Sequence, residues 1–443
     1  MNVHSLSRWL LEQEARALLT RLERVKPFAL QETMLPAAAL SPAALVAIER
    51  FLIGNRYQLR EEVRAFIRWL DHDGGGVEPA ELQRRFTTVR LRFNDALSQF
   101  DLFSEVITQR SESETGVWLS GLDVCAADAL SLPGGYFTAP QAICYLARGP
   151  GAAVRRARTR LPGGGDNPVA IVRVPRERMV GHGIASSLVH EVGHQAAALL
   201  DLIPSYRPLL HAQAQHASHD AEAWDLFERW ISEIVADLWS VAKLGIGSTL
   251  GLMGVVSLPG WFVFRISKDD PHPVPWIRVL ISCAIGDALY PHPQWRQLAA
   301  LWEALYPPES QSLAKQRTLS TLERTIPEFV RVLLEHRPPS LRGHSVGEVI
   351  RDDARTPDRL AANWREWRGR RDRLREAPPT MSFAVIGQAR SLGLVTPEAE
   401  SRVVGNLLTY WALRSTLDIA EMCAAPVSPP TRREQRLLQT QPV

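Results

Sequence analysis

The segment that most restricts how this chain can fold is HEVGH (190–194), which lies within the stretch SSLVHEVGHQAAALLDLIP. Apolar residues recur around it at helical spacing and predict a helix with one buried side. Residues four apart lie on one face of a helix, so His190 and His194 can bind a single metal ion. Glu191 would then lie beside a water molecule on that ion, where a carboxylate can accept its proton. The residues of the apolar side are Ile184, Leu188, Val189, Val192, Ala196, Leu199 and Leu200.

Two histidines at this spacing also occur by chance, and a zinc site needs a third protein ligand. In one known arrangement a glycine lies three residues after the second histidine, and a third histidine lies six residues after the second. Those positions hold Ala197 and Leu200, which excludes that arrangement. The connection that follows offers three further candidates, His211, His216 and His219.

A second predicted helix, AEAWDLFERWISEIVADLWSVAKL (221–244), provides another candidate. Glu233 and Asp237 are four apart on one face of this helix, among tryptophan and aliphatic residues. Two carboxylates in such surroundings are unfavourable unless they are paired or bound to metal. Glu233 would complete a zinc site of two histidines and one glutamate, with water in the fourth position. Asp237 could accept the other ring N–H of a ligating histidine. The alternative is an ordinary solvated helix face.

The succession of HEVGH and EIVAD (233–237) resembles the gluzincins, the thermolysin-like zinc metallopeptidases. The resemblance is confined to these two motifs and the helices around them. It implies zinc as the cofactor, a peptide or protein as the substrate, and Glu191 as the general base. It also implies an α+β fold whose zincin-like core combines a small antiparallel or mixed sheet with two active-site helices.

In gluzincins, a strand before the first helix binds extended substrate along its edge. The segment VAIVRVP (169–175) lies where that strand would be. The resemblance therefore implies that Val169, Ile171 and Arg173 bind the substrate backbone.

The resemblance further implies a side chain beyond the second helix that stabilises the oxyanion of the reaction. The segment DPHPVPWIR (270–278) offers His272 and Arg278, and Tyr290 follows shortly after. We predict His272 for this role. The alternative is a proline-rich turn with ordinary solvated polar residues.

The order of helical and extended patterns divides the chain into four parts. We expect a helical region over 1–115, the metallopeptidase core over 116–305, a second helical region over 306–424 and a disordered tail over 425–443. Within the core, 152–160 and 169–175 predict two strands around a glycine-rich turn. The segment 134–147 predicts either another strand or the entry to a helix.

The stretch from Leu244 to Phe264 contains no charged residue and is long enough to span a membrane. Its glycines and Pro259-Gly260 favour a buried helix followed by a turn and an inner segment. A membrane-anchored metallopeptidase is therefore retained only as an alternative.

Composition excludes several other functions. The net charge of +3 gives no reason to expect nucleic acid as a partner. The four cysteines are widely spaced, which excludes a disulfide framework and a thiolate zinc site. The first residues do not form a signal peptide, so we expect a cytoplasmic protein.

Three further motifs are interpreted as structural. GHSVG (343–347) lacks the preceding strand and the later histidine that a serine hydrolase requires. DHDGGGVEPAEL (71–82) is an imperfect match to a calcium loop, since its twelfth position is Leu82. Acidic residues interrupt the arginines of WREWRGRRDRLR (364–375), which favours a solvated helix. A zincin-shaped binding or regulatory protein without hydrolysis remains an alternative, although no catalytic residue is missing.

Overall fold

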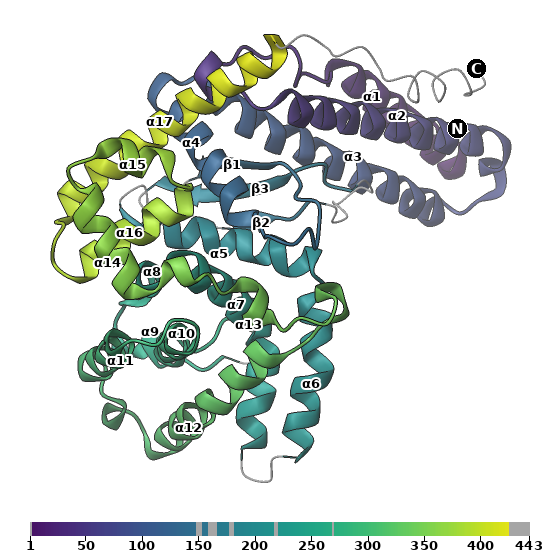
Figure 1. Cartoon of the computed structure of the whole chain (residues 1–443). Coiled ribbons are helices and arrows are strands. Elements are labelled where there is room, and N and C mark those ends of the chain that lie inside the picture. Colours follow the sequence, from purple (N-terminus) through teal and green to yellow (C-terminus); the bar gives the residue numbers. More distant parts are fainter. Residues whose placement is uncertain are drawn as a thin grey trace.

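The computed structural model describes residues 2–147, 153–157, 166–176, 181–216, 220–267 and 270–424. Over these residues the protein is mostly helical and contains one three-stranded mixed sheet, as Figure 1 shows. The expected α+β class is thereby confirmed. The predicted tail over 425–443 lies outside the described residues.

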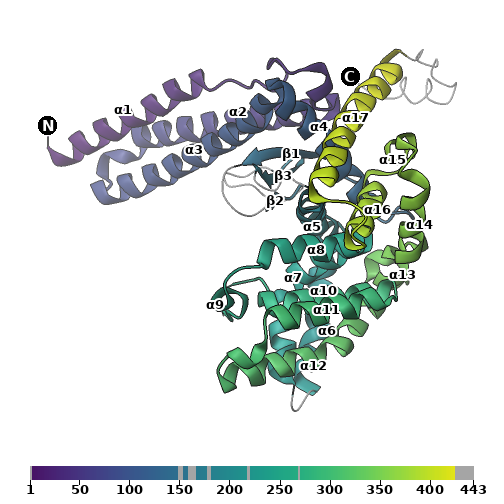
Figure 2. The ribbon, with the colours of Figure 1, turned by 90° about the vertical axis from the view of Figure 1, so that its left-hand side faces the viewer.

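The N-terminal region is helical, as predicted. Its helices are α1 (Val3–Arg24), α2 (Pro42–His72) and α3 (Pro79–Thr108), which pack together and extend away from the sheet in Figure 2. Leu18, Val63 and Phe86 are among the residues of their shared apolar core. Within the segment 71–82, Gly74–Gly76 forms a 3₁₀ turn between the end of α2 and the start of α3, which agrees with a simple helix–turn–helix.

The sheet lies between two layers of helices. Its strands are β1 (Ala142–Ala147), β2 (Ala153–Arg155) and β3 (Ala170–Pro175), in the order β1-β3-β2. Side chains alternate between the two faces, because successive residues of a strand point to opposite sides. Ile143 and Ile171 pack with α2 and α3, whereas Cys144 and Val172 join the core formed with α4 (Ser113–Leu130) and α5 (His182–Leu199).

The position of β3 contradicts the prediction that its edge binds an extended substrate. β3 pairs with β1 in parallel and with β2 in antiparallel orientation, so neither of its edges is free to bind substrate. Nearly every residue of β3 is buried, as expected for a central strand. The two strands predicted within 152–175 are confirmed as β2 and β3, whereas the glycine-rich turn between them lies outside the described residues. Among the described strands, the edges of the sheet are β1 and β2.

A buried ion pair joins the N-terminal helices to the sheet. Arg110, between α3 and α4, is fully buried and contacts Asp123 of α4 at 2.8 Å. It also donates a hydrogen bond to the Cys144 carbonyl at 2.6 Å, while the Cys144 N–H donates to Asp123 at 2.7 Å. Because α4 begins at Ser113, it crosses the boundary predicted at residue 115.

Helices dominate the chain after the sheet. The predicted helix from Ile184 corresponds to α5, and the second predicted helix is α7 (Ala221–Leu244). The connection predicted after the first helix, which carries His211 and His216, is instead mostly α6 (Leu202–His216). Its buried residues Leu202, Tyr206 and Leu210 are four apart and hold it against its neighbours, although Pro208 lies inside the helix.

The uncharged stretch 244–264 forms α8 (Ile246–Val256) and the short helix α9 (Gly260–Val263). No helix among the described residues is both long and apolar enough to cross a membrane. α8 is the predicted buried helix. The segment after it is only partly internal, because Phe264 is buried whereas the Trp261 side chain is 70% exposed.

The remaining helices pack around α7, α8 and α4. In GHSVG, Ser345 is the N-cap of α13 and forms a reciprocal capping box with Glu348. This serine therefore does not follow a strand, as a serine hydrolase would require. The elements are α10 (Pro275–Leu289), α11 (Pro293–Leu305), α12 (Leu313–Glu335), α13 (Val346–Ile350), α14 (Pro357–Trp367), α15 (Arg371–Glu376), α16 (Pro379–Ser391) and α17 (Pro397–Ala424).

Candidate metal centre

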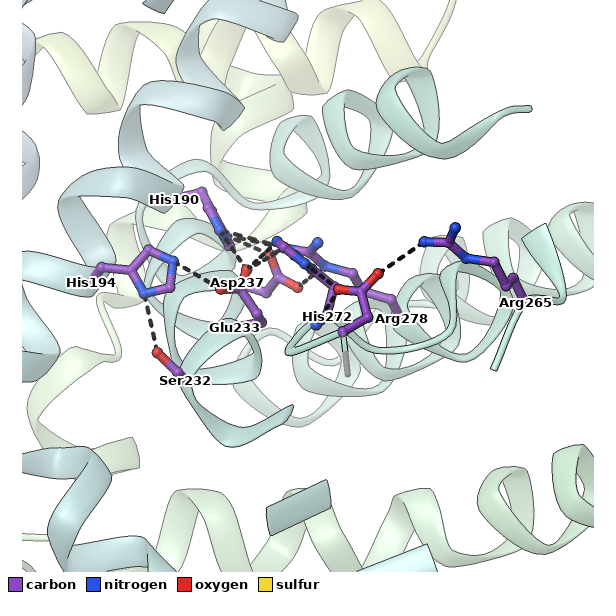
Figure 3. A network of polar contacts seen from close by, with 9 residues as sticks. His190, His194, Ser232, Glu233, Asp237, Arg265, His272 and Arg278 are labelled. Atoms are coloured by element: carbon purple, nitrogen blue, oxygen red, sulfur yellow. Dashed lines mark hydrogen bonds and ion pairs between the residues drawn. The ribbon is translucent and has the colours of Figure 1, made fainter. Parts of the chain in front are cut away.

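The residues predicted as zinc ligands lie together between α5 and α7. His194 of α5 contacts Ser232 of α7, and His190 contacts Asp237, so the two helices run in opposite directions. Figure 3 shows the two imidazole rings converging on Glu233. One potential ligand atom from each of His190, His194 and Glu233 lies within 4.8 Å of the other two.

Each histidine contacts a different oxygen of Glu233, at a distance close to the spacing of ligand atoms around zinc. His190 Nε2 lies 3.2 Å from Glu233 Oε2, and His194 Nε2 lies 3.4 Å from Glu233 Oε1. A tetrahedral zinc ion with bonds of about 2.0–2.1 Å separates its ligand atoms by about 3.3 Å. Glu233 Oε2 is also buried and accepts no hydrogen bond of good geometry among the described residues. Two imidazoles and such a carboxylate fit zinc.

The nitrogen of His190 that faces away from Glu233 has a fixed partner. His190 Nδ1 lies 2.8 Å from Asp237 Oδ1, which leaves Nε2 free to bind a metal. Asp237 is held in turn by Arg278 of α10, whose Nε and Nη2 donate to its two oxygens at 2.6 and 2.9 Å. The role predicted for Asp237 therefore agrees with its position.

The charges of the cluster compensate one another. Burial alone would lower the pKa of His190, but the Asp237 carboxylate raises it to about 9. Burial would raise the pKa of Asp237, yet Arg278 and His190 lower it to about 2. Burial likewise opposes ionisation of Glu233, but the adjacent histidine rings hold its pKa well below the usual range. At neutral pH the two carboxylates are ionised and the His190 ring is protonated in the metal-free protein. Binding of a divalent cation to Nε2 would therefore release one proton.

Gly193, inside the motif, allows the two helices to approach each other. A Cβ atom at this position would lie 2.9 Å from both the Cα and the carbonyl oxygen of Ala236, and 3.0 Å from Trp239 Cβ. Real Cβ atoms are not found that close to backbone atoms. Sequence reasoning missed this residue, because the third and fourth positions of H-E-x-x-H are not restricted.

We expect Gly193→Ala to push α7 away from α5, because the added methyl group meets backbone that cannot yield. The free energy of unfolding of the metal-free protein should fall by about 1–3 kcal/mol, and zinc binding should weaken as well. Urea unfolding and competition with a zinc chelator measure these effects. Gly254→Ala is the matched control, since Gly254 lies in α8 with no atom within 4 Å of an added Cβ. Wild-type zinc affinity in Gly193→Ala would refute this role for the glycine.

A cavity of about 500 Å³ opens in front of the three ligands. Glu191 lines it and is 8% exposed, and burial raises the pKa of its carboxyl group. Ala153 and Val154 of β2 line the same cavity, whereas Ile171 and Arg173 of β3, and Val169 just before it, do not. The prediction that these three residues bind substrate is wrong in its choice of strand, because β2 covers the edge of β3 on this side.

His272 also lines the cavity, as predicted for the oxyanion donor. Its Nε2 lies 3.5 Å from Glu233 Oε2, and its Nδ1 lies 2.7 Å from Asp270 Oδ1. Asp270 is paired with Arg265 at 3.1 Å, so a chain of contacts holds the imidazole toward the ligands, as Figure 3 shows. Asp270 was not predicted, although a short Asp-Pro-His sequence is a signal for such a local contact.

The other residues considered as oxyanion donors or third ligands have different surroundings. Tyr290 is fully buried and donates its hydroxyl to the Ala242 carbonyl, away from the cavity. Arg278 does line the cavity, but its guanidinium is engaged by Asp237. His211 lies beside Glu228, and neither it nor His216 lines the cavity. His219 lies outside the described residues.

Comparison of the chain with protein-family models, with curated proteins and with solved structures gives no match. Any functional assignment therefore depends on the geometry of the cavity and its residues.

Proposed function

We propose that this chain is a zinc-dependent peptidase with a zincin-like core. The observation that carries this proposal is the convergence of His190, His194 and Glu233 on one point at the edge of an open cavity, with Glu191 on the same wall. A purely structural cluster of this kind would need no cavity and no additional carboxylate. A bound zinc ion would polarise a carbonyl group and lower the pKa of a water molecule.

The side chains of the cavity have complementary roles in this reaction. Glu191 accepts the proton of the attacking water and afterwards delivers it to the leaving amine. His272, oriented by Asp270, donates a hydrogen bond to the carbonyl oxygen as its negative charge develops. Asp237 keeps the His190 ring in the orientation and tautomer that leave Nε2 free.

Among the described residues β2 has a neighbouring strand on one side only, and its other edge provides the position for an extended substrate. Strand addition satisfies the backbone groups of an edge strand and places a peptide beside it. Ala153 and Val154 of β2 line the cavity that contains Glu191, so a peptide paired with this edge would pass in front of the ligands.

The proposal is tested by incubating the zinc-loaded protein with a mixture of synthetic peptides and identifying products by mass spectrometry. We expect cleavage that a chelator abolishes and that added zinc restores. If the protein binds zinc but cleaves no peptide, the alternative of a non-hydrolytic binding protein replaces the proposal. Cleavage that continues after complete removal of metal contradicts it.

A further inference from the structure

The cavity continues beyond the metal ligands toward α8. Because α5 and α7 are antiparallel, the turn before His190 faces the turn after Asp237. We call the wall at this point the serine end. It consists of Ser186, Ser187, Ser240, Ser248, Leu252 and Val255.

The serine end contributes no charged side chain of its own. α8 has none along its whole length, and the hydroxyl of Ser248 donates to that of Ser240 at 2.8 Å. Both serines are buried, at 4% and 1% exposure. A charged group entering this region would lose its water without gaining an ionic partner, which is strongly unfavourable.

The nearest charged side chain is Glu191, which lies one turn after Ser187 on α5 and lines the same cavity, and which we assign to the attacking water. The other charges are engaged or lie elsewhere. Asp237 is paired with Arg278 through two hydrogen bonds. Arg156 also lines the cavity, but the next residue, Ala157, donates its N–H to Gln195 at 2.7 Å. This places the backbone of Arg156 beside the His194 end of α5, about two and a half turns from Ser186 and Ser187.

The wall behind the serine end is closely packed. A Cβ atom on Gly387 of α16 would lie 2.9 Å from the Cα of Gly247 of α8, so the two helix backbones are in contact. α8 therefore has no room to move back for a larger side chain.

We propose that the serine end is a specificity pocket for a small or medium-sized uncharged side chain next to the bond that is cleaved. The four hydroxyl groups and two aliphatic side chains of the serine end suit a substrate side chain of alanine, serine, threonine, valine or leucine. The inference rests on the proposed peptidase function and gives it a substrate class.

The test uses the full-length, zinc-loaded protein and a peptide mixture in which every residue type occurs on both sides of the bond. We expect uncharged small and medium side chains at one of the two adjacent positions, with charged ones depleted there by about tenfold or more. Charged residues cleaved equally well at both positions would overturn the inference. This differs from failure of the proposed function, in which no Glu191-dependent cleavage occurs at all.

A substitution at the serine end gives the converse test. Ser187 is partly exposed, so Ser187→Asp adds a carboxylate at the pocket with little effect on folding. We expect the preference to shift toward lysine and arginine. Ser257→Asp is the matched control, because Ser257 ends α8 outside the cavity and adds the same charge. An unchanged preference in folded Ser187→Asp, or an equal shift in Ser257→Asp, overturns the inference.

Binding to an inactive protein provides a readout that does not depend on turnover. The zinc-loaded Glu191→Gln variant should bind a hexapeptide with a central alanine pair about tenfold or more tightly than the analogues with aspartate or lysine at the selected position. Calorimetric titration measures these affinities. Equal affinities for the three peptides contradict the proposed pocket.

Discussion

Replacement of Glu191 by Gln is expected to lower kcat by about 10²–10⁴-fold while zinc content and folding remain unchanged. Gln has nearly the same shape as Glu but cannot accept a proton from water. Glu191 is not among the three clustered ligands, so the metal should be retained. The measurement combines peptide cleavage rates with elemental analysis and urea unfolding of the same preparations.

Glu228→Gln is the matched control for this prediction. Glu228 lies on α7 beside His211, away from the cavity, and its replacement changes the net charge by the same amount. We expect wild-type cleavage by this variant. Unchanged activity in Glu191→Gln would show that this carboxylate is not the general base.

We expect the second large effect on zinc affinity, which should fall when a metal ligand is removed. Asp237→Asn removes only a partner of a ligand and should weaken zinc binding by about 10–100-fold. Glu233→Ala and His190→Ala each remove a direct ligand, so we expect a larger loss than in Asp237→Asn. Competition with a chelator of known affinity measures the order of these losses.

His211→Ala is the control for the ligand series, since His211 was the competing candidate for the third ligand. Its side chain is 62% exposed and contacts Glu228, so its replacement should leave zinc affinity unchanged. If His211→Ala loses zinc while Glu233→Ala retains it, the assignment of the third ligand is wrong.

Some parts of the site could be predicted because they depend on local periodicity. The spacing of His190 and His194, and of Glu233 and Asp237, places each pair on one helix face regardless of the rest of the fold. The apolar residues around both pairs then indicate which faces are buried. The structure adds that the two faces meet.

Other parts depend on contacts between distant segments. The resemblance points to 169–175 as the substrate strand, whereas strand order depends on pairing with β1, which nothing in 169–175 reveals. Its almost continuous apolar sequence was nevertheless a signal of a central strand, and the arginines at 155 and 156 were a signal of an edge. The role of Gly193 requires knowledge of which backbone it faces.

The zinc content of the purified wild-type protein tests the central claim most directly. After incubation with zinc and removal of the free ion, elemental analysis should find one zinc ion per chain and almost none in His190→Ala. A wild-type protein that retains no zinc, or a His190→Ala variant that retains as much as the wild type, would contradict the assignment of His190, His194 and Glu233 as a metal centre.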